Sequence, residues 1–219
     1  MTVTVTPERI EAAYRRLGYK SSWRFMTCPE RQFDDPEVLL VSLNPSGRVE
    51  HGPSWSQEEG SAYVVESWDG QAPGADTFQV QIQRLVHHLD STFERVASAH
   101  FVPFRSQRWA ELAHSEEATR FARELWKDFV GGLRPKYVMC LGTTVGKYVP
   151  ALFGTRPLLK KQSGWGNVSI SVGQTSHGGQ LAVLPHLGTF KLFSRAECAP
   201  FLRTAIGPGS LVDAGSKCG

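Results

Sequence analysis

The hydrophobic positions of the chain form two kinds of pattern, short apolar runs and longer stretches with helical spacing. Five short, mostly apolar runs occur, at residues 38–43, 96–104, 135–142, 168–172 and 181–184. The first is partly β-branched, begins after Pro36 and ends in Asn44-Pro45-Ser46-Gly47. A short continuous run bounded by turn residues is typical of a strand covered on both faces. We therefore predict a strand at each run.

Stretches with helical spacing separate these runs. At residues 7–17 the apolar positions follow the i, i+3, i+4, i+7 spacing, after a Thr6-Pro7 start and before Gly18. Similar patterns predict helices over 77–89, 115–129, 143–153 and about 187–206. Strands that alternate with helices imply βαβ units. We expect an α/β fold with three layers, αβα, in which helices cover both faces of a central, mostly parallel sheet.

The chain reads as one domain with a tail. No repeat, low-complexity segment or linker interrupts residues 1–206, and residues 207–219 are rich in Gly and Ser, which predicts a flexible tail. Between residues 49 and 75 lies a long polar stretch that contains Tyr63 and Trp68. Loops longer than about 15 residues are often functional. The aromatic side chains of this stretch either stack on a planar ligand or anchor the loop to the core.

Composition narrows the class of protein. The 219 residues are 41% hydrophobic, enough for one sizeable α/β core. No run approaches the roughly 18 apolar residues of a membrane span, and the N-terminal segment does not have the pattern of a signal peptide, so we expect a cytoplasmic protein without a membrane partner. The four cysteines are scattered, which predicts neither a disulfide framework nor a metal site. A net charge of +3 and a pI of about 8.7 permit contact with nucleic acid.

Polar side chains follow three of the predicted strands, at the edge where an α/β sheet binds its ligands. They are Asn44, Ser46 and Arg48 after the first run, residues 100–106 at the end of the second, and His186, Thr189 and Lys191 after the last. The chain has no Gly-x-Gly-x-x-Gly motif, Walker phosphate loop or Gly-x-Ser-x-Gly elbow. Nucleotide cofactors and serine-hydrolase chemistry are therefore disfavoured.

Four segments, taken in order, resemble the motifs of the uracil-DNA glycosylase superfamily. Leu43-Asn44-Pro45-Ser46-Gly47 resembles the first motif, which reads Gly-x-Asn-Pro-Gly in the mismatch-specific and single-strand-selective branches. Pro185-His186 is similar to the second motif, which typically reads His-Pro-Ser. Residues 101–106 resemble the end of the middle strand, and residues 137–142 the strand and Gly before the next helix. The resemblance spans about residues 36–195.

This resemblance implies a DNA base-excision glycosylase without a cofactor or metal, which holds uracil or another deaminated base, flipped out of the DNA, in a pocket at the strand ends. Asn44 would orient the attacking water, and His186 would donate a hydrogen bond to the oxygen of the departing base. The residues implied to bind the base are Ser46, Tyr63, Trp68, His100 and Phe104. Those implied to bind DNA phosphates are Arg48, Lys191 and Arg195. We expect a monomer whose partner is single- or double-stranded DNA.

The chain also departs from the superfamily pattern. His100 stands where several branches have an Asn that reads the base edge, and Leu187-Gly188 replaces the Pro-Ser of the second motif. Ser42 stands where Gly is usual, and the first motif has no acidic residue. An imidazole pairs with one edge atom at a time in a given tautomer.

Two further hypotheses therefore stay open. One is a non-catalytic module that binds a base, a nucleotide or modified DNA, and the other is a hydrolase of small nucleoside-like metabolites. His100 and His186 also have simpler interpretations, as a satisfied core residue and as a turn residue that bonds backbone carbonyls.

Overall fold

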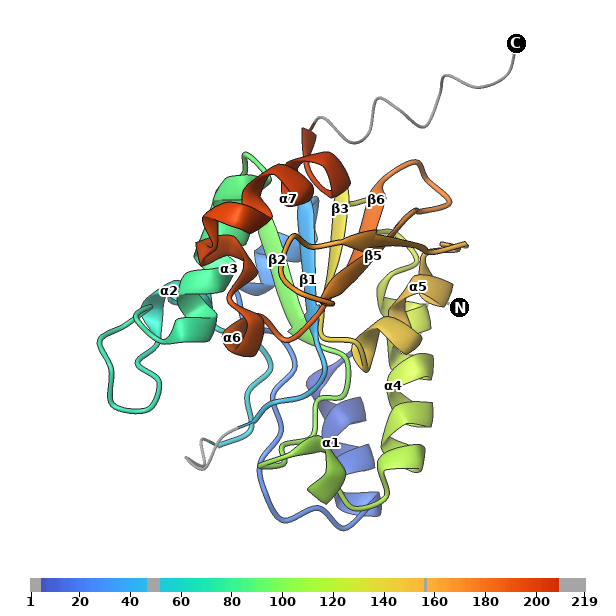
Figure 1. Cartoon of the computed structure of the whole chain (residues 1–219). Helices are drawn as coiled ribbons and strands as arrows, with labels where there is room; N and C mark the ends of the chain where they lie inside the picture. Colours follow the sequence, from blue (N-terminus) through green and yellow to red (C-terminus); the bar gives the residue numbers. More distant parts are fainter. Residues whose placement is uncertain (1–4, 47–51, 156, 209–219) are drawn as a thin grey trace.

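The computed structural model describes residues 5–46, 52–155 and 157–208. These residues form one six-stranded sheet in the order β2-β1-β3-β6-β5-β4 (Figure 1). Four neighbouring strands are parallel, namely β2 (Val96–His100), β1 (Val38–Ser42), β3 (Tyr137–Leu141) and β6 (Gln180–Leu184). The hairpin of β5 (Ser169–Gln174) and β4 (Leu159–Gln162) extends the sheet in antiparallel fashion.

Helices cover both faces of this sheet (Figure 1). One face carries α1 (Pro7–Arg16), α4 (Ser115–Phe129) and α5 (Val149–Leu152). The other carries α2 (Ala62–Val65), α3 (Thr77–His88), α6 (Leu187–Phe190) and α7 (Ala199–Ala205). Short 3-10 turns lie at Glu30–Phe33, Phe93–Arg95, Trp109–Glu111, Val145–Lys147, Leu192–Ser194 and Ala196–Cys198. The expected α/β class, with a mostly parallel sheet between two helical layers, is confirmed.

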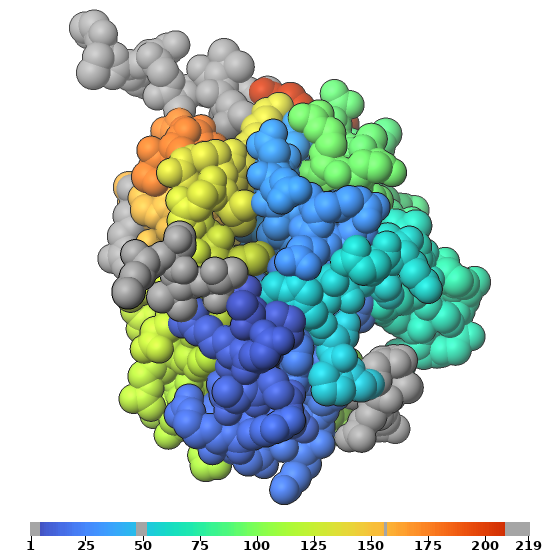
Figure 2. Space-filling view, turned by 180° about the vertical axis from the view of Figure 1, so that it is seen from behind, coloured from blue at the N-terminus to red at the C-terminus, as the bar shows by residue number. Residues whose placement is uncertain are grey.

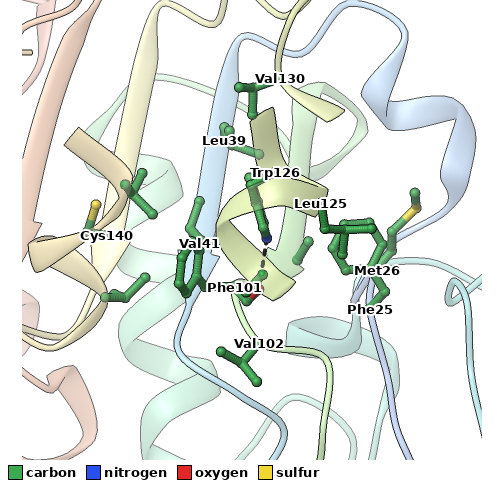
Figure 3. Packing of buried hydrophobic residues seen from close by; sticks show 14 of the residues in the cluster. Phe25, Met26, Leu39, Val41, Phe101, Val102, Leu125, Trp126, Val130 and Cys140 are labelled. Atoms are coloured by element: carbon green, nitrogen blue, oxygen red, sulfur yellow. Dashed lines mark hydrogen bonds between the residues drawn. The ribbon is translucent and has the colours of Figure 1, made fainter. Parts of the chain in front are cut away.

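The side chains of the central strands alternate between two hydrophobic cores. In β1, Leu39 and Val41 face α1 and α4, whereas Val38 and Leu40 face α3, and all four are fully buried. Figure 3 shows the first core around Trp126 of α4, whose Nε1 donates a hydrogen bond to the carbonyl oxygen of Phe101 at 2.9 Å. A strand covered on both faces needs apolar side chains at every position, which explains the continuous runs in the sequence.

Side-chain contacts join α1 to its surroundings. Seen from behind, α1 lies beside α4 (Figure 2), and Arg9 of α1 forms an ion pair with Asp128 of α4 at 2.6 Å. Gly18 ends the helix as predicted, with a φ of +71°, a left-handed conformation that glycine adopts without steric cost.

The start of α3 connects the helix to the long polar stretch. Asp76 caps the helix by accepting from the N–H of Phe78 at 2.7 Å, while the Gln79 side chain accepts from the N–H of Asp76 at 3.0 Å. Together they form a capping box. The Gln79 amide also donates to the carbonyl oxygens of Ala62 and Glu66, at 2.9 and 2.8 Å. The same side chain therefore starts the helix and anchors the loop before it.

The structure differs from the predicted elements in three places. The strand β4 was not predicted, because its Leu-Lys-Lys-Gln sequence is exposed at every position. Lysines of this kind protect a sheet edge from pairing with other chains. The strand predicted at 96–104 ends at His100, since Pro103 lies just beyond and cannot donate to a ladder. The helices predicted over 143–153 and 187–206 are each divided into short α-helical and 3-10 segments.

Two further predictions concern the tail from residue 207 and the absence of a membrane-spanning helix. Of the tail predicted from residue 207, Gly207 is buried and its N–H donates to the Gln180 side chain at 3.2 Å. Residues 209–219 lie outside the described residues. No helix within the described ranges combines the length and the apolar character that a membrane crossing requires.

Candidate functional site

The carboxyl ends of β1, β2, β3 and β6 meet at one edge of the sheet, because these strands are parallel. The chain leaves β1 toward β2 on one side and leaves β3 toward β6 on the other, so the two connections diverge. Open α/β sheets bind ligands at such a switch point. Neighbouring strands lie about 4.8 Å apart, so the residues that follow β1 and β6 begin roughly 10 Å apart, with β3 between them.

Asn44 follows β1, and its side-chain nitrogen is held on three sides. Nδ2 donates to Ser106 Oγ at 2.9 Å, to the carbonyl oxygen of Pro45 at 3.1 Å and to that of Phe104 at 3.3 Å. These bonds tie the turn after β1 to the turn after β2 and fix which way the amide points. No residue in the described part of the chain donates to Oδ1, which is therefore an available acceptor.

His186 follows β6 and belongs to a stack of three rings. Its imidazole stacks on Phe78 of α3 with 5.3 Å between centroids and 14° between planes, and Phe78 stacks on Trp68 at 6.5 Å and 19°. Tyr63 meets both Trp68 and Phe78 edge-on, at 5.8 and 6.0 Å. His186 is exposed, and its Nδ1 lies 3.1 Å from Thr189 Oγ1. Two predicted base-binding residues, Tyr63 and Trp68, thus belong to the cluster that carries His186.

Phe78 is the centre of this stack, and sequence reasoning did not select it. It appeared only as one position on the apolar face of a predicted helix. An added Cβ at Gly188 would lie 3.1 Å from His186 Cε1 and 3.4 Å from Phe78 Cβ. Because Gly188 has no side chain, the His186 imidazole can lie beside the Gly188 backbone and stack on Phe78.

His100 ends β2 directly opposite Ser42 of β1. The Nδ1 of His100 and the Oγ of Ser42 are 2.7 Å apart. Burial lowers the pKa of His100 well below its ordinary value, and the positive charges of Arg24 and Arg105 lower it further. The imidazole is therefore neutral. No described residue forms a hydrogen bond with its Nε2.

Arg24 and Glu66 form a half-buried ion pair beside His100. Two guanidinium nitrogens of Arg24 donate to the two carboxylate oxygens of Glu66, at 3.0 and 2.5 Å. Trp68 and Gln57 donate to the same carboxylate, at 2.9 and 2.7 Å. Burial would raise the pKa of Glu66, but the hydrogen bonds and charge of Arg24 outweigh it, and the pKa is lowered. Glu66 therefore anchors the loop as a carboxylate; its oxygens are engaged, which leaves it poorly placed to act as a base.

Phe104 does not reach the site, and the prediction that it stacks on a base is wrong. Its side chain is fully buried in the core beneath α1 and α4. Its ring packs against Tyr19 at 4.7 Å, Phe121 at 5.6 Å and Tyr14 at 6.5 Å. The chain turns after His100 and directs this ring away from the face that carries Ser42 and His100.

Three of the remaining predicted residues, Ser46, Lys191 and Arg195, follow strands that end at this edge of the sheet. Ser46 is exposed, and its carbonyl oxygen accepts from the Arg105 guanidinium at 2.6 Å. Lys191 is exposed at the end of α6, and its role as a phosphate ligand stays a prediction. Arg195 lies over the ring of Trp165, 3.5 Å from its centroid, and its Nε donates to the carbonyl oxygen of Phe190 at 2.9 Å. Arg48 lies outside the described residues.

The described part of the chain holds no group of three or more His, Cys, Asp or Glu side chains that is placed to bind a metal ion. A cavity of about 270 Å³ lies between α4 and α5, lined by Arg123, Lys127, Arg134 and His177 among others. Because Arg134 and His177 precede β3 and β6, this cavity lies toward the opposite edge of the sheet from Asn44 and His186.

Comparison with known proteins adds no family assignment. No protein-family model matches the chain, and a search of curated proteins finds no matching sequence.

Proposed function

We propose that this protein is a DNA base-excision glycosylase, which hydrolyses the N-glycosidic bond of uracil or another deaminated base held at the strand ends. The orientation of Asn44 carries the proposal. Its nitrogen is engaged by three oxygen acceptors, so its Oδ1 is the atom offered to a ligand. An oxygen fixed in this way accepts a hydrogen bond from a water molecule and orients it for attack.

In this mechanism the rate depends more on stabilising the departing base than on activating the water. Hydrolysis passes through an oxocarbenium-like sugar while the base departs as an anion. An amide cannot take a proton, so Asn44 activates water less than a carboxylate does. The rate therefore depends on a donor at the base oxygen where negative charge accumulates.

His186 is the donor in this proposal. When the Thr189 hydroxyl donates to Nδ1, across the 3.1 Å that separates them, the ring proton is on Nε2. That N–H then donates to the departing base, and the stack on Phe78 holds the ring plane. Water is the only co-reactant, so the reaction needs no cofactor. Exposed Lys191, which follows α6, is the nearest candidate for a phosphate contact.

One observation favours a second candidate, a module that binds a base without cleaving it. Leu187 is fully buried in the core beneath α3. The residue after His186 therefore cannot enter a DNA duplex as a wedge without leaving the core. A protein that binds single-stranded or already unpaired DNA has no need of such a wedge.

The test uses single- and double-stranded oligonucleotides that carry uracil, hypoxanthine or xanthine, followed by alkali to reveal abasic sites. We expect alkali-labile product with the wild-type protein and at least about a hundred-fold less with Asn44→Ala or His186→Ala. His87→Ala, at an exposed position of α3, is the matched control and should cleave normally. Salt-sensitive binding without product would favour the binding module. Cleavage of free nucleosides but not of DNA would favour a nucleoside hydrolase.

A further inference from the structure

The cavity between α4 and α5 is lined by basic side chains and, among the described residues, by no Asp or Glu. Arg123 and Lys127 belong to α4, Arg134 precedes β3, and His177 lies in the turn between β5 and β6. In Figure 1, α5 lies beside the end of α4 that leads to β3. The whole chain has 24 Lys and Arg and 21 Asp and Glu residues, so its charges are nearly balanced. Basic side chains are therefore concentrated at this cavity.

The two basic side chains of α4 are available to a ligand. Arg123 and Lys127 are exposed and lie four positions apart, which places them on one face of the helix. Asp128, the acidic residue next to Lys127, forms its ion pair with Arg9 at 2.6 Å. Neither Arg123 nor Lys127 forms a side-chain ion pair or hydrogen bond with a residue that the structure describes. Both therefore line the cavity as cations without a neutralising partner.

The other two basic side chains are held by backbone carbonyl groups. Arg134 Nη1 donates to the carbonyl oxygens of Leu133 at 2.9 Å and Gly131 at 3.3 Å. The Nε2 of His177 lies 2.9 Å from the carbonyl oxygen of Pro135, which can only accept, so Nε2 carries the proton. These contacts position Arg134 and His177 without an acidic partner. The charge of Arg134 is thus not neutralised by its supports.

The floor of the cavity is apolar. Val130, Leu133 and Phe153 line it and are buried, whereas the cations at its rim are exposed. The N–H of Ser176 donates to the carbonyl oxygen of Phe153 at 2.9 Å and joins the turn between β5 and β6 to the end of α5. Pockets for drug-sized ligands measure about 300–1,000 Å³. At about 270 Å³, this cavity suits a smaller molecule that has both an anionic group and an apolar part.

We propose that this cavity binds a small phosphate monoester, with the phosphate among Arg123, Lys127 and Arg134 and the organic group on the apolar floor. A phosphate monoester carries roughly two negative charges near neutral pH, so it gains more from three cations than a singly charged anion does. The guanidinium groups also match the geometry of phosphate oxygens. The cavity lies toward the opposite edge of the sheet from Asn44 and His186. This binding site is therefore independent of the proposed base cleavage.

The first experiment locates the bound anion by NMR of the histidine rings, with phenyl phosphate as the probe at pH 7.5. His177 lines the cavity and His88 does not, but the Nε2 of each lies 2.9 Å from a backbone carbonyl oxygen, so the two rings are matched reporters. His177→Gln assigns the His177 signals. We expect phenyl phosphate to shift the His177 signals in a saturable manner and to leave those of His88 unchanged. Absence of a shift at His177, or a shift at His186 instead, overturns the proposal.

Two related probes separate the contributions of charge and apolar contact. Phenyl sulfate has the same ring but one negative charge fewer, and inorganic phosphate has the charge but no ring. We expect phenyl phosphate to bind at least about five-fold more tightly than either, because only phenyl phosphate uses both the cations and the apolar floor. Equal affinities for the three probes in the same titration overturn the proposal.

The second experiment removes two of the cations, in the double variant Arg123→Gln with Lys127→Gln. Both residues are exposed on α4, so the variant should keep its fold, which thermal denaturation checks. We expect phenyl phosphate to bind at least about ten-fold more weakly. Lys160→Gln with Lys161→Gln is the matched control, because it removes the same charge from exposed positions of β4 outside the cavity. An equal loss of affinity in both double variants overturns the proposal, since the net charge alone would then explain the binding.

A competition experiment identifies the source of the phosphate monoester, which occurs on small metabolites and at the 5′ end of a DNA strand. Short oligonucleotides with a 5′-phosphate or a 5′-hydroxyl group are added to the complex with phenyl phosphate, and the His177 signals report displacement. Displacement by the phosphorylated oligonucleotide alone supports the proposal with a DNA end as the ligand. Displacement by neither supports it with a free small molecule. Displacement by both overturns it, because the basic side chains would then bind the phosphodiester backbone. None of these outcomes depends on whether the protein cleaves DNA.

Discussion

The two faces of β1 and β2 differ at the end where the candidate site lies. On the face toward α1 and α4, Leu39 and Val41 of β1 and Ala97 and Ala99 of β2 are apolar to the last residue. On the face toward α3, both strands begin with apolar residues but end in Ser42, Ser98 and His100. Adjacent residues of the same strand therefore lie on opposite faces, one in an apolar core and the next among hydrogen-bonded polar side chains.

The two faces therefore contribute differently to the stability of the fold and to the candidate site. Apolar contacts on the first face stabilise the fold, whereas the polar side chains on the second face form hydrogen-bonded pairs, Thr27 with Ser98 and Ser42 with His100. A buried hydrogen bond fixes the positions of its two members, and removing one of them leaves the other without that partner. Substitutions on the two faces should therefore have different consequences.

The largest expected effect is on stability, from Phe101→Ala on the apolar face. Phe101 is fully buried and stacks on Tyr148, with 5.2 Å between centroids and 2° between planes. Removing the ring leaves a cavity, which should lower the free energy of unfolding by about 3–5 kcal/mol. Urea denaturation measures this change.

Thr27→Val, on the polar face, is the comparison for this experiment. It keeps the side-chain shape but removes the hydroxyl that is hydrogen-bonded to Ser98. We expect the free energy of unfolding to fall by about 1–3 kcal/mol, because the buried Ser98 hydroxyl loses this partner. If Thr27→Val cost as much as Phe101→Ala, the assignment of stability mainly to the apolar face would be wrong.

Asn44→Asp should have the next largest effect, and again on stability. Aspartate is nearly the same size as asparagine, but a carboxylate cannot donate to the carbonyl oxygens of Pro45 and Phe104. Oxygen would then face oxygen at both contacts, and we expect a loss of about 1–3 kcal/mol in urea denaturation at pH 7. Asn44→Ala removes the amide without adding charge and should cost less. A variant with aspartate as stable as the wild type would mean that the amide nitrogen does not hold the turn.

The sequence predicted the central strands because they are covered on both faces and carry no interrupting polar residue. β4 escaped prediction because an exposed edge strand has no apolar periodicity. Asn44 and His186 could be selected because each lies two residues beyond the end of a strand that the sequence predicts, within a recognisable motif. Their catalytic roles stay predictions. The ion pair of Arg24 and Glu66 was not predicted. The two residues lie 42 positions apart, and no sequence pattern indicates that they meet. Phe104 was misplaced because a linear pattern does not reveal which way the chain turns after a strand.

A smaller effect concerns the pH dependence of stability. In the folded protein the pKa of His100 lies well below its ordinary value, while in the unfolded chain it is about 6.5. Below that pH the unfolded chain takes up a proton that the folded protein does not. The contribution of His100 is therefore fully present above about pH 6.5 and is lost as the pH falls, by at most about 1.4 kcal/mol per pH unit.

Urea denaturation between pH 7.5 and pH 5 measures this slope, and His100→Asn provides the comparison. The variant should lose stability less steeply as the pH falls, because asparagine does not titrate. The charges that face His100, those of Arg24 and Arg105, do not change over this range. Equal slopes in the two proteins would mean that His100 is protonated as easily in the folded state as in the unfolded chain.

The smallest expected effect tests whether the stack on Phe78 matters to His186. In Gly188→Ala the new Cβ would lie 3.1 Å from His186 Cε1, so the ring must move by a few tenths of an ångström. Stability should change by less than about 1 kcal/mol, but cleavage of uracil-containing DNA should slow several-fold, because catalysis is sensitive to small displacements. Gly132→Ala, where an added Cβ meets no atom within 4 Å, is the control and should cleave normally. A Gly188→Ala enzyme of unchanged rate, beside an inactive His186→Ala, would mean that His186 acts without help from the ring that supports it.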